Sequence, residues 1–264
     1  MRSSLCLAVC LGAAGAQAQP AAQIEVIDVV GATPLGGAID TDRIAANVLT
    51  ASAAELREQG ALDLADFMKR SMGSVFVNEA QSNPLQPDVQ YRGFVGSPLL
   101  GLPQGLAIYQ DGVRINEPFG DTVNWALIPE SAIDSLYLVP GSNPLFGLNA
   151  LGGSIAVRTK DGFAHEGASA ELTAGSFGRI QAQAETGASF SDELGYFVTA
   201  SLLEEDGWRD YSPTDAQQIF GKLTWLGEDS RLDVGLTRVG TDLVGNGAAP
   251  EDLLELDREA IFTR

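Results

Sequence analysis

The stretch from Leu136 to Lys160, LYLVPGSNPLFGLNALGGSIAVRTK, decides the fold of this chain. It holds two short β-rich runs on either side of a loop that is too apolar for an ordinary linker. Apolar side chains recur at every second position in both runs, which is the period of a β-strand. Glycine adopts positive φ and allows close backbone approach, so the loop glycines predict a compact turn between paired strands. These glycines are Gly141, Gly147, Gly152 and Gly153.

The same loop has some of the features of a phosphate-binding loop. From Gly147 to Ser154 the glycines and the final serine have P-loop spacing, but Gly153 stands where the lysine must be. Without that lysine the charge of a bound triphosphate would go uncompensated. The sequence therefore disfavours nucleotide binding.

The N-terminus has the features of a secretory signal. Arg2 precedes an apolar run over residues 5–16, and residues 16–18 read Ala-Gln-Ala, an A-x-A cleavage site. We therefore predict a signal peptide over residues 1–18. A lipid anchor at Cys10 is disfavoured, because the bulky Val9 precedes it and the cysteine comes too early.

Composition excludes several classes of function. Cys6 and Cys10 are the only cysteines and both lie in the signal, so the exported protein is expected to use no disulfide, thiolate or Cys-ligated zinc. The net charge of −19 disfavours nucleic-acid binding, which needs a basic footprint. It suits solubility or a surface that meets cations. No apolar run of about 20 residues follows the signal, so a membrane role would have to use β-strands.

Residues 19–48 form an arm of small and polar residues with one β-prone cluster, which precedes the breaker run 31–34. An extended segment like this can add a strand to the sheet of a partner protein. The alternative is an ordinary N-terminal strand. The cluster comprises Ile24, Glu25, Val26, Ile27, Asp28, Val29 and Val30.

Residues 49–162 predict one α+β domain, because they mix two short helices with several short strands. Ser52 and Glu55 form a capping box at the start of the first helix, and the second helix is amphipathic. The dipeptide Asp111-Gly112 is a strong signal for a hairpin turn. Strands are expected over residues 75–78, 89–92, 106–110 and 113–116.

Residues 163–264 change to long alternating strands. Apolar and polar side chains alternate almost without fault over residues 179–190. One apolar and one polar face over about ten residues is typical of a transmembrane β-strand, with a soluble sandwich or lipocalin strand as the alternative. Similar runs cover residues 168–175, 195–204, 217–226 and 231–240. About five strands cannot close a barrel. The predicted fold class is therefore an α+β domain followed by antiparallel transmembrane strands of an incomplete β-barrel.

Taken in order, these segments resemble TonB-dependent outer-membrane receptors, with residues 49–162 as the plug domain. The resemblance rests on residues 91–94 (YRGF), 108–114, 147–160 and 206–210 (DGWRD). The plug-motif residues are Arg92, Gly93, Phe94, Asp111, Gly112, Gly147, Gly152, Gly153 and Arg158.

The resemblance implies that residues 24–30 are a TonB box, which binds a periplasmic TonB-type energy-coupling protein. It also implies a place in a Gram-negative-type outer membrane, contact of the strands with lipid, and energy-coupled import of a scarce small solute. That solute is most often a ferric siderophore, and sometimes cobalamin or another metal chelate. The chain would be the N-terminal portion of such a receptor; a truncated remnant, a passive porin and a surface-binding module are the alternatives.

Charge pairs between plug and barrel have two candidates, Arg92 and Arg158, because Ser135, Tyr137 and Pro140 stand where receptors often carry charges. An enzyme is disfavoured, since no catalytic motif is present. The single histidine, His165, is expected to be a solvated linker residue. Neither a cofactor nor a metal site is predicted.

Overall fold

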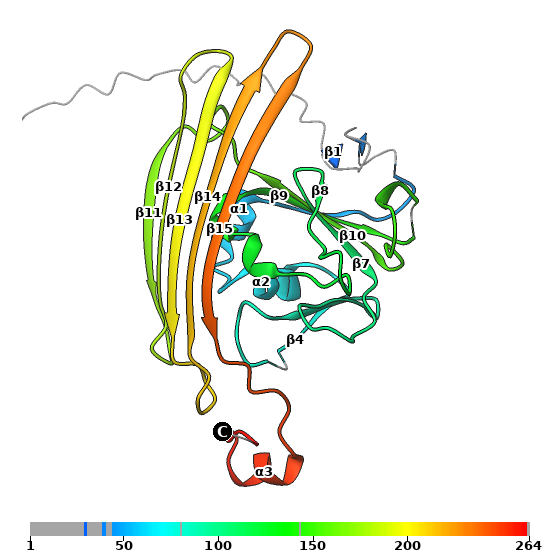
Figure 1. Ribbon diagram of the computed structural model, residues 1–264, viewed down its shortest axis with the longest axis vertical. Helices are drawn as coiled ribbons and strands as arrows, with labels where there is room; N and C mark the ends of the chain where they lie inside the picture. Colours follow the sequence, from blue (N-terminus) through cyan, green and yellow to red (C-terminus); the bar gives the residue numbers. More distant parts are fainter. Residues whose placement is uncertain (1–28, 31–38, 41–43, 80, 143, 263–264) are drawn as a thin grey trace, which may run out of the picture.

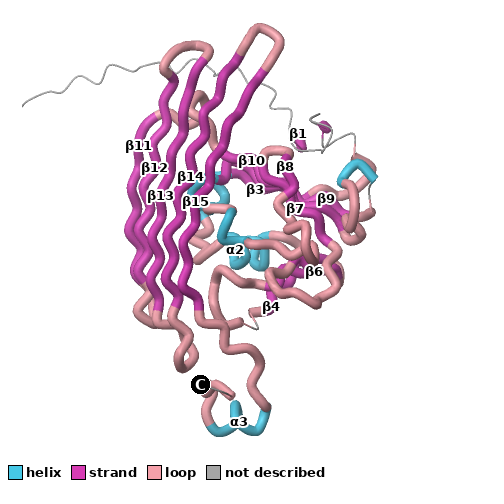
Figure 2. Tube along the Cα trace, in the orientation of Figure 1, coloured by secondary structure: helices cyan, strands magenta, loops and turns pink. Residues whose placement is uncertain are grey.

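The computed structural model describes residues 29–30, 39–40, 44–79, 81–142 and 144–262 (Figure 1). It has two parts, a sheet of five long strands and a smaller α+β domain that lies against one face of that sheet (Figures 1 and 2). We refer to the five-stranded sheet as the wall. In the described part of the chain, no helix is long and apolar enough to cross a membrane.

The α+β domain contains two sheets and two helices. One sheet has the order β3-β9-β10-β7-β8 and the other the order β4-β5-β6. The elements are β3 (Leu49–Ser52), α1 (Ala53–Glu58), α2 (Leu64–Ser71), β4 (Val75–Asn78), β5 (Asp88–Tyr91), β6 (Phe94–Gly96), β7 (Leu106–Gln110), β8 (Val113–Arg114), β9 (Ile133–Pro140) and β10 (Gly153–Thr159), with the 3₁₀ turns η2 (Trp125–Leu127), η3 (Glu130–Ala132) and η4 (Pro144–Phe146).

The stretch that decides the fold forms β9 and β10. The two strands pair antiparallel, with Leu138 opposite Ile155, as the alternation predicts. Gly153 has φ +149°, and a Cβ there would lie 2.4 Å from the carbonyl oxygen of Val139, so only glycine fits. The strand β10 also pairs in parallel with β7, an arrangement for which the sequence carries no local signal.

Local signals account for the helices and the tight hairpin. Ser52 caps α1 and the carboxylate of Glu55 accepts the Ser52 backbone N–H at 2.8 Å, which confirms the capping box. Asp111 and Gly112 have φ +47° and +83° between β7 and β8, which confirms the hairpin turn. The buried faces of both helices join the core of the domain together with β9 and β10.

The wall is an antiparallel meander of the five predicted strands. They are β11 (Gly167–Ala174), β12 (Ile180–Ser189), β13 (Leu194–Glu205), β14 (Thr214–Leu226) and β15 (Arg231–Leu243), followed by α3 (Glu251–Leu256). The face turned away from the α+β domain carries exposed apolar side chains: Leu172, Ile180, Val198, Leu202, Ile219, Leu223, Leu232, Val234 and Leu236. The alternation therefore separates an apolar outer face from an inner face that meets the domain.

The two ends of the wall differ. The turns β12–β13 and β14–β15 are tight and lie at one end, while the longer connection over residues 206–213 and the segment with α3 lie at the other (Figure 1). The strand β1 (Val29–Val30), which pairs with β2 (Ile39–Asp40), lies in the half of the molecule nearer the tight turns (Figure 1).

Candidate functional site: the seam between the α+β domain and the wall

The seam, meaning the interface between the α+β domain and the wall, is centred on the short turn η3. The Thr199 hydroxyl of β13 donates to the Ser131 hydroxyl at 2.8 Å. Ala132 is fully buried beneath Phe197 and Phe220, one aromatic ring from each of two neighbouring wall strands. This turn is the point at which the domain docks on the wall.

A buried lysine of the wall forms an ion pair with the domain beside this turn. Lys222 has only 3% of its side chain exposed, and its Nζ lies 3.2 Å from Asp111 Oδ2 and 3.1 Å from Thr159 Oγ1. The Asp111 carboxylate also accepts the Thr159 backbone N–H at 2.9 Å. Because a buried charge is costly unless it is paired, this node ties the hairpin turn and the end of β10 to β14.

Two further ion pairs cross the seam. Lys160 is also buried, and its Nζ lies 2.6 Å from Glu185 Oε2 on β12. The same ammonium lies 5.6 Å from the centroid of the Phe197 ring, within range of a cation–π contact. At the tight-turn end, Arg231 Nη2 lies 2.9 Å from Asp161 Oδ2.

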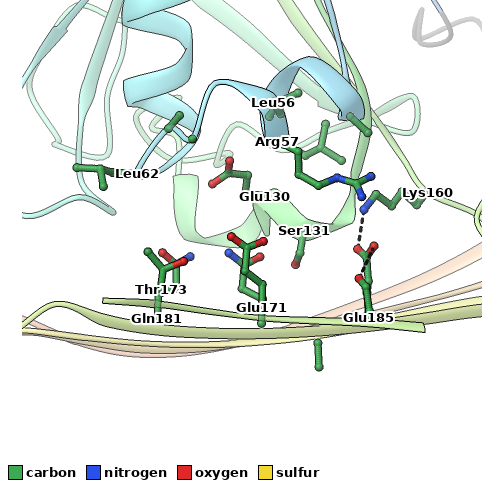
Figure 3. Close-up of a pocket in the computed structure, with 17 residues that line it drawn as sticks. Leu56, Arg57, Leu62, Glu130, Ser131, Lys160, Glu171, Thr173, Gln181 and Glu185 are labelled. Carbon is green, nitrogen blue, oxygen red and sulfur yellow. Dashed lines mark hydrogen bonds and ion pairs between the residues drawn. The ribbon is translucent and has the colours of Figure 1, made fainter. Parts of the chain in front are cut away.

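Beside the docking turn the seam is hollow. A cavity of about 170 Å³ separates α1 and η3 from β11 and β12. Figure 3 shows Glu130 from the domain side and Glu171 from the wall side of this cavity. A smaller cavity of about 50 Å³ shares Glu130, Ser131, Gln181 and Gln183 with it. The large cavity has room for several waters, and its lining is polar enough to hold them.

Burial perturbs two carboxyls of the domain at these cavities. Burial, together with the nearby carboxylate of Asp63, raises the pKa of Glu130 to about 7. Burial likewise raises the pKa of Asp63 to about 6, against the opposing effect of its hydrogen bond from the Asp66 backbone N–H. Arg179 lies near both, but its Nη1 is 2.8 Å from Glu205 and its Nη2 donates to the Leu62 carbonyl.

Within the described residues, the charge contacts of Arg92 and Arg158 lie inside the α+β domain, so their pairing with a barrel stays a prediction. The Arg92 guanidinium lies over the Tyr91 ring at 5.0 Å, within its own domain. Arg158 Nη2 lies 2.7 Å from Asp134 Oδ2, and Asp134 belongs to the adjoining strand β9. Arg158 is the one residue of β10 whose side chain is exposed, so its charge finds a carboxylate beside it rather than one across the seam.

The sequence predicts that His165 is a solvated linker residue, and the structure contradicts this prediction. Its side chain is only 22% exposed, with Nε2 3.4 Å from Asp134 Oδ1. Its ring meets the edge of Phe197 at 6.3 Å, and burial lowers the pKa of His165. Among the residues that the structure describes, no three His, Asp or Glu side chains group so as to hold a metal.

The remaining motif residues build the domain rather than the cavities. Arg92 and Gly93 have positive φ in the turn between β5 and β6, and Phe94 follows that turn. A Cβ on Gly152 would lie 2.4 Å from Phe94 Cβ, so the ring packs where a side chain would otherwise stand. Gly147 has φ +73° after η4, beside the Tyr109 hydroxyl, which donates to the Phe146 carbonyl at 2.6 Å.

The TonB-box-like cluster lies mostly outside the described residues. Residues 24–28 fall outside them, and Val29 and Val30 form β1. Their role as a partner-binding segment stays a prediction.

Three residues at the seam, Lys160, Lys222 and Glu130, were missed by sequence reasoning. One signal was available for Lys222. It is a charged residue at an inward position of an alternating strand, where its pairing partner is Phe197. Glu130 offers no such signal, because its environment depends on how the two parts pack.

Comparison with known proteins identifies the α+β domain. Residues 40–154 match the family described as TonB-dependent Receptor Plug Domain. The chain carries a TonB-dependent receptor plug domain. No curated protein matches the chain in sequence. TonB-dependent receptors are not enzymes, in agreement with the non-catalytic function predicted from the sequence.

Solved receptors share the fold of plug and wall. The unliganded ferric citrate transporter FecA is 15% identical, with a TM-score of 0.66 over 83% of this chain and 34% of that one. The pyoverdine outer membrane receptor FpvA from Pseudomonas aeruginosa PAO1 is 16% identical, with a TM-score of 0.62 over 79% of this chain and 30% of that one. BauA, the ferric preacinetobactin receptor from Acinetobacter baumannii, is 15% identical, with a TM-score of 0.60 over 80% of this chain and 30% of that one. The chain thus spans about a third of the length of these receptors.

Proposed function

We propose that this chain serves in a TonB-dependent outer-membrane receptor that imports a scarce solute, with a ferric siderophore as the favoured class. The observation that carries the proposal is a plug domain docked on the inner face of a wall whose outer face is apolar. A closed sheet of this kind suits lipid outside and a plugged lumen inside. The solute class is supported by the names of the solved receptors, which bind or transport ferric citrate, pyoverdine and ferric preacinetobactin.

In this proposal the protein is exported by its N-terminal signal and lies in the outer membrane, with the tight turns facing the periplasm. Short turns on that side and longer loops outside are the usual pattern of such barrels. In this orientation β1, the described end of the segment 24–30, lies on the periplasmic side, because it is nearer the tight turns (Figure 1). There it would add a strand to a TonB-type partner, whose pull would remodel the plug.

The proposal is tested by uptake of radioiron in cells that express the gene product. The probes are ferric citrate, a ferric catecholate and a ferric hydroxamate, each measured with and without a proton gradient. We expect one of them to bind at the surface under both conditions but to enter only with the gradient. Uptake that persists without the gradient would identify a passive porin instead.

The TonB box is tested by proline in the cluster. Val26→Pro removes an amide donor and fixes φ, so it should abolish uptake while surface binding persists. Val26→Ala is the matched control and should be milder, because strand addition depends on backbone hydrogen bonds. Normal uptake with the proline variant would mean that the cluster is only a terminal strand.

A further inference from the structure

Glu130 occupies an unusual place at the seam. It is the first residue of η3. Ser131, which follows it, forms a hydrogen bond with Thr199, and Ala132 is buried beneath Phe197 and Phe220. It lines both cavities, and no hydrogen bond from a protein group satisfies its carboxylate within the described part of the chain. An ionised Glu130 must therefore take its solvation from water inside the seam, beside the turn that docks the plug.

The charges that face Glu130 are mostly of the same sign. Arg179 is the nearby cation, its side chain is only 6% exposed, and its Nε is buried without a hydrogen-bond partner. Its Nη1 is already committed to Glu205. The charged groups that face Glu130 and Asp63 from the packed elements are Arg57 of α1, Asp66 of α2, Glu79 after β4, Lys160 after β10, Glu171 of β11, and Arg179 and Glu185 at β12.

Of the three cations in this set, Lys160 and Arg179 are already paired with other carboxylates. Lys160 is paired with Glu185 at 2.6 Å across the seam, and the dashed line in Figure 3 marks this contact at the far side of the cavity from Thr173. Arg57 lines the same cavity, but its side chain is exposed on α1, so solvent weakens its attraction for Glu130. The carboxyls of Asp63, Glu130 and Glu171 thus converge on the cavities with less positive charge than would balance them.

From this arrangement we infer that Glu130, together with Asp63, forms a proton-binding latch that sets how firmly the plug sits on the wall. With the carboxyls protonated, η3 can dock in the low-dielectric seam without repulsion from Glu171. With Glu130 ionised, hydration of the carboxylate and repulsion across the cavity separate η3 from β13. Asp63 caps α2 and Glu130 begins η3, so release of the latch loosens the corner formed by α1, α2 and η3.

The direction of the pH dependence follows from the raised pKa values. A carboxyl whose pKa is raised in the docked state favours docking while it is protonated. That contribution is complete below the ordinary values of 3.8 and 4.5 and is lost as the pH rises through about 6 for Asp63 and about 7 for Glu130. For Glu130 alone, a rise from 4.5 to about 7 corresponds to at most roughly 300-fold in the docking equilibrium.

The experiment measures the distance between plug and wall directly. Two nitroxide labels are placed in the full gene product at Ala54→Cys, on the exposed side of α1, and Val198→Cys, on the outer face of β13, in a background without Cys6 and Cys10. The distance distribution is recorded by pulsed electron resonance in lipid at about pH 5 and about pH 8.5. No solute or energy-coupling partner is present, so a failure here is separate from a failure of the proposed import.

We expect the population with the longer distance to rise at least roughly tenfold between the two pH values. Glu130→Gln should hold the low-pH distribution at both, and Asp63→Asn should shift the midpoint while preserving the cap of α2, because asparagine also caps helices. Glu58→Gln is the matched control, since Glu58 is exposed on α1 outside the cavity lining, and it should behave as the unsubstituted protein. An unchanged distribution in the unsubstituted protein, or full pH dependence in Glu130→Gln, would overturn the latch.

Discussion

Replacing Lys222 by methionine tests whether the buried node at Asp111 holds the plug to the wall. Removing one partner of a buried ion pair costs about 3–5 kcal/mol when the other charge is left uncompensated. Asp111 keeps both hydrogen bonds from Thr159, and its side chain is 24% exposed, so part of that cost is avoided. We therefore expect a loss of about 2 kcal/mol in the local stability of the plug hairpin.

The assay is native-state hydrogen exchange of the Asp111 amide, which donates to the Val157 carbonyl at 2.9 Å. A loss of about 2 kcal/mol corresponds to roughly 30-fold faster exchange. Lys69→Met is the matched control, because Lys69 pairs with Glu79 at 3.7 Å with both side chains about half exposed, and exposed pairs contribute little. Equal exchange rates in the two variants would refute the reasoning, since burial of the Lys222 pair would then have no consequence.

Two other predictions concern the plug itself. Gly152→Ala should destabilise the plug by about 1–3 kcal/mol in chemical denaturation, because the new Cβ would lie 2.4 Å from Phe94 Cβ. Gly73→Ala is the control, because a Cβ there meets nothing within 4 Å. Equal losses of stability in the two variants would show that the contact with Phe94 is irrelevant. Ser52→Ala should lower the stability of the plug by about 1 kcal/mol by removing the cap of α1, whereas Ser52→Asn should lower it less. Thermal unfolding measures this ranking, and the reverse order would contradict the prediction.

Local chemistry explains which elements could be predicted from the sequence. The capping box at Ser52, the Asp111-Gly112 turn and the alternation of residues 179–190 each specify structure within a few residues, and each is confirmed. The parallel pairing of β10 with β7 joins segments far apart in the chain, so no local pattern announces it. The partners of Arg92 and Arg158 could not be predicted for the same reason, because a contact across a seam depends on how two finished units dock.

The docking point nevertheless leaves a trace in the wall strands. Inward positions of a water-filled barrel are expected to be polar. Phe197 and Phe220 depart from this rule. Phe197 lies opposite Lys222 and Phe220 opposite Thr199, and all four residues are at most 5% exposed. The two phenylalanines pack against Ala132 of the plug. Lys222 forms an ion pair with Asp111, and Thr199 forms a hydrogen bond with Ser131. Aromatic residues at inward positions of a mostly polar face therefore indicate where the wall contacts protein rather than water. A buried lysine beside them needs a carboxylate from that protein. In this chain the aromatic residues and the lysine lie on the adjacent strands β13 and β14. The plug therefore docks there through the turn η3 and the β7–β8 hairpin, and the cavities lie to the side.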